Sequence, residues 1–229
     1  DITEENFYKA IDFIAASGEQ QLGLIGGEPT LHPKLHDFVR YIVGKPAISD
    51  VMIYTNGLHL DRLVPLCRDA STSGMVKILV NCNAPQVIGE KSFERLIEQL
   101  DQAIFQYHMS QNIKLGLNLY DNDFDYSFIK DLLVRYDMHQ LRISLTVPDF
   151  SVCGRLDGLD NFKKRKDFLF RFFHEMEAIG VMPYYDCNKP PCCICQHFPV
   201  SIYKVTPRVL FARPLPNEIG VFSVGDKTN

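Results

Sequence analysis

The stretch Leu22-Gly23-Leu24-Ile25-Gly26-Gly27-Glu28-Pro29-Thr30 decides the fold of this 229-residue chain. Its first four residues form a short apolar run, which predicts a strand, and two glycines close that run. The segment that follows, 31–43, is amphipathic and predicts a helix. The order strand, glycine turn, helix is the building unit of an α/β fold.

The same alternation repeats along the chain. Patterns of apolar residues predict a first helix at 2–16, with Thr3 as its N-cap and Gly18 as its stop. They predict further strands at 51–54, 76–80, 113–120 and 141–147, and helices at 60–68, 93–107, 124–136 and 162–179. Strands separated by such helices form a parallel sheet with right-handed crossovers. We therefore expect an α/β fold, an open and partial parallel βα barrel. Because a helix opens the chain where a strand should come first, we expect the first strand of that barrel to be missing.

The composition changes after residue 180. Prolines at 183, 190, 191, 199, 207, 214 and 216 interrupt helical continuity. We predict two domains, a partial βα barrel at 1–180 and a small Cys- and Pro-rich C-terminal lobe at 181–229.

Charge and hydropathy exclude several classes of partner. The chain has 24 Lys and Arg against 28 Asp and Glu, a formal net charge of -4, so it lacks the basic field that binds nucleic-acid phosphates. It also lacks an apolar stretch of about 18 residues and a signal peptide at its start. We expect no nucleic-acid partner, no membrane insertion and a cytoplasmic protein.

Small and amide side chains stand where the predicted strands end. The carboxyl ends of parallel strands converge at one edge of the sheet, which is where such folds bind ligands. These residues predict a polar pocket that can hold an amino acid and a ribose, although each also suits an ordinary turn. They are Gly26 to Thr30, Thr55, Asn56, Gly57, Asn81, Asn83, Asn118, Ser144 and Thr146.

The glycine pair has two interpretations. Gly26 and Gly27 allow a ligand to approach the backbone closely, Glu28 supplies a carboxylate, and Pro29 stiffens the turn. The pair is equally compatible with a plain tight turn. Arg142 on the last strand has the same ambiguity, because it can meet a ligand carboxylate or pair with a neighbouring acid.

The motif Gly26-Gly27-Glu28-Pro29-Thr30, with Tyr54-Thr55-Asn56-Gly57 at the next strand end, resembles the radical S-adenosylmethionine (SAM) superfamily over roughly residues 1–180. In that family the glycine turn contacts the methionine amino group of SAM, and later strand ends hold its carboxylate and ribose. The resemblance therefore implies a set of SAM-binding residues: Gly26, Gly27, Glu28, Pro29, Thr55, Asn56, Asn81, Asn118 and Ser144. No catalytic side chain is assigned.

The cysteine loop that defines this family is not in the sequence. Its C-x3-C-x2-C pattern binds a 4Fe-4S cluster between the first strand and the first helix, and the chain begins at that helix. We expect that truncation or disorder explains the absence, and that the chain as given cannot cleave SAM.

A second group of thiols, Cys187, Cys192, Cys193 and Cys195, lies in a proline-rich segment. Thiolates at such short spacings bind an iron-sulfur cluster or zinc, and the D-C-x2-P-x-C pattern resembles the auxiliary-cluster lobe of some radical SAM peptide-modifying enzymes. Four unliganded thiols are the alternative. The isolated Cys67, Cys82 and Cys153 are predicted to be buried free thiols, and His32 and His36 to have surface or capping roles rather than to bind metal.

Two functions from different classes fit these observations. In its intact form, the protein would be a radical SAM enzyme that takes an electron from a donor, cleaves SAM to a 5′-deoxyadenosyl radical and abstracts hydrogen from a substrate, by family analogy a peptide or protein. The alternative is a non-catalytic α/β ligand-binding or partner-binding protein with a structural zinc or thiol cluster.

Overall fold

The computed structural model describes residues 2–119, 125–145 and 168–185 of the chain. Six strands form one sheet in the order in which they occur along the chain. They are β1 (Gln21–Leu24), β2 (Asp50–Thr55), β3 (Val76–Cys82), β4 (Ile113–Leu119), β5 (Gln140–Leu145) and β6 (Met182–Tyr185). The five predicted strands are therefore present at the predicted places.

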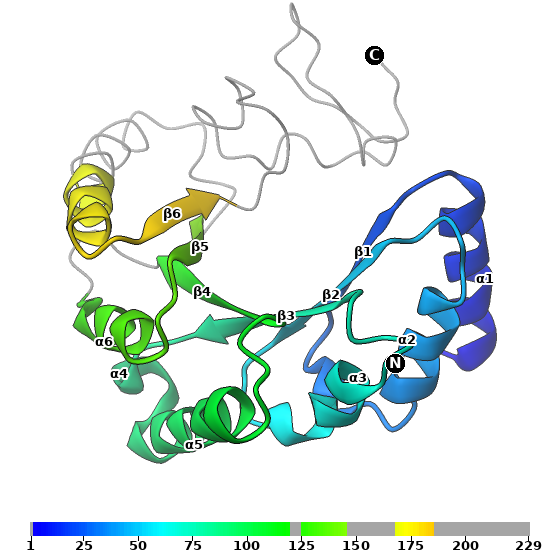
Figure 1. Cartoon of the computed structure of the whole chain (residues 1–229), viewed down its shortest axis with the longest axis horizontal. Helices are drawn as coiled ribbons and strands as arrows, with labels where there is room; N and C mark the ends of the chain where they lie inside the picture. Colours follow the sequence, from blue (N-terminus) through cyan, green and yellow to red (C-terminus); the bar gives the residue numbers. More distant parts are fainter. Residues whose placement is uncertain (1, 120–124, 146–167, 186–229) are drawn as a thin grey trace, which may run out of the picture. The chain divides into compact units, whose positions relative to one another are not determined.

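The pairing of the strands confirms the predicted fold class. Each of the four pairings from β1 to β5 is parallel. Because β1 and β6 lie at opposite ends of the order, the sheet is open rather than closed into a barrel. In Figure 1 the strands follow one another around an arc from β1 to β6. The fold is thus α/β with an open parallel sheet.

Strand β6 was not predicted from the sequence. It is only four residues long and contains Pro183, which removes a backbone donor and disguises the strand pattern. The amide of Met182 donates to the carbonyl oxygen of His139, just before β5, at 2.9 Å. The sheet therefore includes residues that the sequence analysis assigned to the C-terminal lobe. Residues 186–229 of the lobe predicted at 181–229 lie outside the described residues, and the domain boundary stays a prediction.

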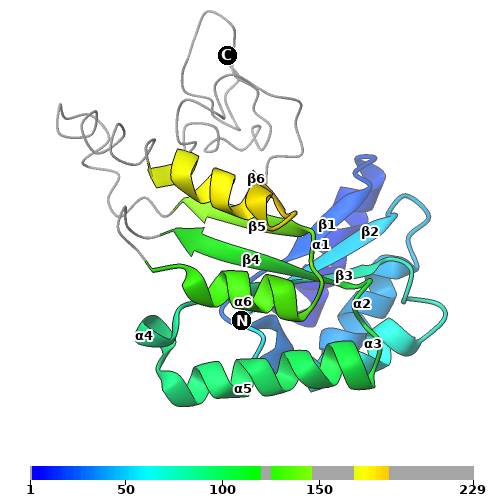
Figure 2. The same ribbon diagram turned by 60° about the vertical axis from the view of Figure 1, so that its left-hand side comes forward.

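Helices connect consecutive strands and lie together on one side of the sheet (Figures 1 and 2). They are α1 (Glu4–Ala16), the 3₁₀ helices η1 (Pro29–Leu31) and η2 (Leu60–Leu63), α2 (Leu35–Val43), α3 (Val64–Arg68), α4 (Pro85–Ile88), α5 (Glu90–Asp101), the π-helical η3 (Gln102–Gln106) and α6 (Ser127–Arg135). Residues 168–178 are also helical. As predicted, Thr3 caps α1 by accepting from the Asn6 amide at 3.3 Å, and Gly18 follows its end with φ +84°.

The helix predicted at 31–43 is divided in the structure. Pro33 disfavours helical backbone in the preceding residue, and His32 is extended with φ -74° and ψ 124°. As a result η1 ends at Leu31 and α2 begins only at Leu35. This break leaves the glycine turn and η1 as a separate short unit between β1 and α2.

The two faces of the sheet differ in chemistry. On the face toward the helices, alternate residues such as Ile53, Ile78 and Leu115 are fully buried and pack against helix residues such as Leu96 and Ile129. The opposite face, which we call the polar face, carries half-buried side chains at the intervening positions: Met52, Tyr54, Lys77, Asn81, Lys114, Asn118 and Arg142. Within the part of the chain that the structure describes, no helix has the length and apolar character needed to cross a bilayer.

Candidate functional site

The turn after β1 exposes its backbone. Gly26 and Gly27 are both exposed, and a Cβ atom built on either would meet no other atom of the described residues within 4 Å. Neither glycine has a positive φ, so the backbone of this turn would accept side chains without strain. Packing among the described residues therefore does not require glycine here, whereas a ligand lying against the backbone would.

Glu28 connects this turn to the end of β2. Its Oε1 accepts from the Thr30 amide at 3.1 Å, from Thr30 Oγ1 at 2.6 Å and from Thr55 Oγ1 at 2.7 Å. Its Oε2 accepts from the Asn56 amide at 2.8 Å. The carboxylate thus has four donors from the protein, and it holds two strand ends that are 27 residues apart in sequence as one unit.

The turn after β2 is closed, in contrast to the first. Thr55 is buried and its hydroxyl also accepts from the Gly57 amide at 3.1 Å. Gly57 has φ +80°, and a Cβ there would lie 2.5 Å from Leu96 Cδ1 and 2.7 Å from Val80 Cγ1. Asn56 is exposed, but its Oδ1 accepts from the Leu58 amide at 3.0 Å. The second turn is therefore fixed by packing and by internal hydrogen bonds.

On the polar face, Asn81, Gly116 and Arg142 form a row across β3, β4 and β5, because Asn81 pairs with Gly116 and Gly116 with Arg142. A Cβ on Gly116 would lie 3.2 Å from Asn81 Oδ1, so the glycine leaves room for the neighbouring side chains. Arg142 is on β5 and Tyr54 is on β2, yet Arg142 Cζ lies 5.9 Å from the ring centroid of Tyr54. Long side chains therefore lie across this face above a glycine.

The Oδ1 atom of Asn81 is a buried acceptor without a hydrogen-bond partner among the described residues. Leaving such an acceptor unsatisfied costs roughly 1–3 kcal/mol. A ligand hydroxyl or N–H on the polar face would satisfy it. Further toward the carboxyl end of β4 than Gly116, Asn118 pairs in register with Ser144 on β5.

The predicted SAM-binding residues therefore fall into two groups. Glu28, Thr55 and Asn56 are joined by hydrogen bonds beside Gly26, Gly27 and the half-buried Pro29. The second group, Asn81, Asn118 and Ser144, lies on β3, β4 and β5. That all of them line one cavity stays a prediction.

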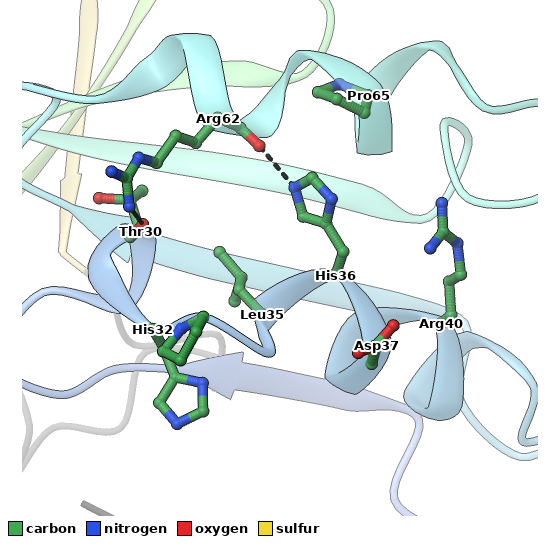
Figure 3. A pocket seen from close by; sticks show the side chains of 9 residues that line it. Thr30, His32, Leu35, His36, Asp37, Arg40, Arg62 and Pro65 are labelled. Carbon is green, nitrogen blue, oxygen red and sulfur yellow. Dashed lines mark hydrogen bonds between the residues drawn. The ribbon is translucent and has the colours of Figure 1, made fainter.

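A pocket lies beside Thr30, the last residue of the glycine motif, where η1 and α2 face η2 and α3 (Figure 3). Arg62 of η2 forms part of its wall and donates from Nη1 to the carbonyl oxygen of Thr30 at 3.1 Å. The carbonyl oxygen of Arg62 accepts from His36 Nε2 at 2.6 Å, which Figure 3 shows as a dashed line. The other histidine, His32, accepts on Nδ1 from the Lys34 amide at 3.1 Å. Both histidines thus bond to backbone, in agreement with the capping role.

The cysteines divide between described and undescribed parts of the chain. Cys67 and Cys82 are buried free thiols, as predicted, and burial raises the pKa of each to about 12. Cys153 and the proposed metal ligands Cys187, Cys192, Cys193 and Cys195 lie outside the described residues. Across residues 2–119, 125–145 and 168–185, no group of three or more His, Cys, Asp or Glu side chains is arranged to hold a metal ion.

The sequence pattern did not indicate Arg62 or the row through Gly116. A glycine inside a strand pattern often marks a close approach of neighbouring atoms, and Gly116 stands between Lys114 and Asn118 at the polar positions of β4. Arg62 gave no such signal, because it contacts Thr30 across 32 residues of sequence.

Comparison with known proteins finds relatives that include GTP 3′,8-cyclases and proteins named for molybdenum cofactor biosynthesis. The GTP 3′,8-cyclase of Chlorobaculum tepidum is 27% identical over 186 residues, which cover 75% of this chain and 53% of that protein. The GTP 3′,8-cyclase of Actinobacillus succinogenes is 25% identical over 165 residues, 69% of this chain and 49% of that protein. Molybdenum cofactor biosynthesis protein 1 of Mus musculus is 26% identical over 106 residues, which cover 45% of this chain and 17% of that protein.

No family model matches the chain. The chain spans about half the length of the two bacterial GTP 3′,8-cyclases. It is thus similar to part of these enzymes.

Proposed function

We propose that this chain is the SAM-binding part of a radical SAM enzyme. The observation that carries the proposal is the exposed Gly26-Gly27 backbone at the carboxyl end of β1, held in place by a Glu28 carboxylate that already has four internal donors. The similarity to GTP 3′,8-cyclases supports the family assignment.

The residues of the site fit SAM chemically. Backbone carbonyl oxygens of the glycine turn can accept from the methionine ammonium group. Asn81 Oδ1, which has no hydrogen-bond partner among the described residues, can accept from a ribose hydroxyl. The side-chain amide of Asn118 suits the same ligand. Glu28 is expected to position the turn rather than to bind SAM, because its oxygens are already occupied. Within this proposal, Pro29, Thr55, Asn56 and Ser144 keep their predicted places around the ligand.

SAM, together with a reduced 4Fe-4S cluster, supplies a 5′-deoxyadenosyl radical that abstracts hydrogen from the substrate. The cysteines for that cluster are not in this chain, and an electron donor is part of the proposal. We further propose that Cys187, Cys192, Cys193 and Cys195 bind an auxiliary iron-sulfur cluster.

Two substrate classes are considered. The Cys-rich C-terminal segment favours a peptide or protein, by analogy with peptide-modifying members of the family. The printed name of the bacterial relatives favours a purine nucleotide, GTP. The polar face, with Arg142 and two lysines, has cations suited to phosphate, and we propose the nucleotide as the first substrate to test.

The test uses the full-length protein that contains this chain, reconstituted anaerobically with iron and sulfide. With dithionite and SAM, we expect 5′-deoxyadenosine to form, and its rate to rise when GTP is added. A rise only with peptide would favour the peptide class. If the protein neither binds SAM nor forms 5′-deoxyadenosine, and instead retains stoichiometric zinc, the non-catalytic alternative is correct.

A further inference from the structure

We infer that Arg62 is a positioning residue that braces the glycine motif through Thr30, so that SAM meets a backbone that is already ordered. This inference rests on the proposed function for the identity of the ligand. It begins from the contact between Arg62 Nη1 and the carbonyl oxygen of Thr30, at 3.1 Å, in the pocket that both residues line (Figure 3). Thr30 is the last residue of the motif that carries the glycines.

Thr30 is held on two sides. Its amide and its hydroxyl both donate to Glu28 Oε1, on the side toward β2. Its carbonyl oxygen accepts from Arg62, on the side toward η2. Because Thr30 is 2% exposed, it is clamped between the two charged groups. Movement of Thr30, at the end of the glycine motif, therefore requires one of these contacts to break.

The Arg62 side chain can hold Thr30 in place only if the backbone of η2 is itself fixed. Three sets of contacts fix η2. Leu60 and Leu63, on either side of Arg62, are fully buried in the core. The Asp61 amide donates to Oε1 of the buried Gln99 on α5 at 3.0 Å. The carbonyl oxygen of Arg62 accepts from His36 on α2 at 2.6 Å. Arg62 therefore transmits the position of the core to Thr30.

Preorganisation is the physical role of such a brace. A loop that becomes ordered only when ligand binds loses backbone entropy at that step, which weakens binding. Loss of one hydrogen bond to a charged donor, partly screened at an exposed guanidinium, should reduce SAM affinity by roughly three- to tenfold. Global stability should hardly change, because Arg62 is exposed and its aliphatic neighbours carry the packing.

The experiment compares Arg62→Gln and Arg62→Lys with Arg68→Ala, a matched control at an exposed arginine in the adjacent α3. In the full-length reconstituted protein without reductant, SAM binds but is not cleaved, and its dissociation constant is measured by equilibrium dialysis. We expect the predicted loss in Arg62→Gln, partial recovery in Arg62→Lys, and no change in Arg68→Ala.

A second measurement does not depend on SAM. The amides of Leu31 and His32 donate to the carbonyl oxygens of Glu28 and Pro29 within η1, at 3.1 and 3.0 Å. Hydrogen exchange at these two amides, without ligand, should be faster in Arg62→Gln than in wild type, while exchange in β3 is unchanged. If Arg62→Gln fails to fold, Arg62→Lys carries both measurements.

Unchanged exchange at Leu31 and His32 in the Arg62 variants would overturn the inference, and so would equal losses of affinity in Arg62→Gln and Arg68→Ala. Failure of the wild-type protein to bind SAM would instead overturn the proposed function. The exchange measurement would then still decide whether Arg62 holds the turn.

Discussion

The turns that follow β1 and β2 share the Glu28 carboxylate, yet backbone conformation and packing require glycine only in the second turn. Gly57 has φ +80° and would place a Cβ 2.5 Å from Leu96, so the fold itself demands it. Gly26 and Gly27 have ordinary φ values and open space where a Cβ would lie. The comparison separates a glycine that packing requires from glycines that no contact among the described residues requires, and that a ligand would explain.

The largest expected effect is on Gly57. Replacing it with Ala should lower the free energy of unfolding by roughly 2–4 kcal/mol, since it combines a left-handed backbone with overpacking against Val80 and Leu96. Chemical denaturation measures this loss. Gly74→Ala is the control, because Gly74 has no atom within 4 Å of a built Cβ and no positive φ. Equal losses in the two variants would remove the basis of the comparison.

The next effect concerns the carboxylate that both turns share. Glu28→Gln should lower the free energy of unfolding by roughly 1–3 kcal/mol, because the amide loses the negative charge and brings an NH₂ group where Oε1 or Oε2 accepts. Glu19→Gln, at an exposed glutamate before β1, is the control. Hydrogen exchange at the Asn56 amide should accelerate only in the Glu28 variant. Equal exchange in both would show that the two turns are not coupled.

The Cys82 thiol reports whether water reaches the side of β3 against which Gly57 packs. Burial raises the pKa of this thiol from 9.0 to about 12. Because the folded-state pKa is raised, the contribution to stability is complete below pH 9 and is lost as the pH rises toward 12. At pH 10 the loss should be roughly 1–2 kcal/mol.

The measurement is the pH dependence of the unfolding free energy from pH 8 to pH 10.5. Cys82→Ser has no thiol to titrate, so its stability should fall less steeply over this range, whatever its absolute value. The same slope in both proteins would show that water reaches this side of β3.

The smallest expected effect on stability is at Gly26. Gly26→Ala should change the free energy of unfolding by less than about 0.5 kcal/mol, because the new methyl group meets no atom of the described residues. The same substitution should weaken SAM binding in the full-length reconstituted protein, measured by equilibrium dialysis. A stable variant with unchanged SAM affinity would mean that the turn does not contact the ligand.

Local patterns allowed much of the fold to be predicted. Apolar runs located five strands to within one or two residues, and the glycine motif was correctly placed between β1 and the next helix. The prediction was less accurate at elements where proline changes the pattern. Pro33 divides the helix predicted at 31–43, and Pro183 lies within the unpredicted β6. Runs and periodicities predict elements well when side chains alternate regularly, and poorly when a missing N–H breaks them.

The sequence by itself determined the α/β rhythm, the glycine turn after the first strand and the carboxylate beside it, because these depend on neighbouring residues. Only the tertiary structure decided what that carboxylate does. Glu28 reaches Thr55 across 27 residues, and Arg62 reaches Thr30 across 32. The row from Asn81 through Gly116 to Arg142 likewise exists only because three strands pair in one register. Contacts between distant segments depend on strand order and register, and these are fixed by packing of the whole sheet rather than by any local pattern.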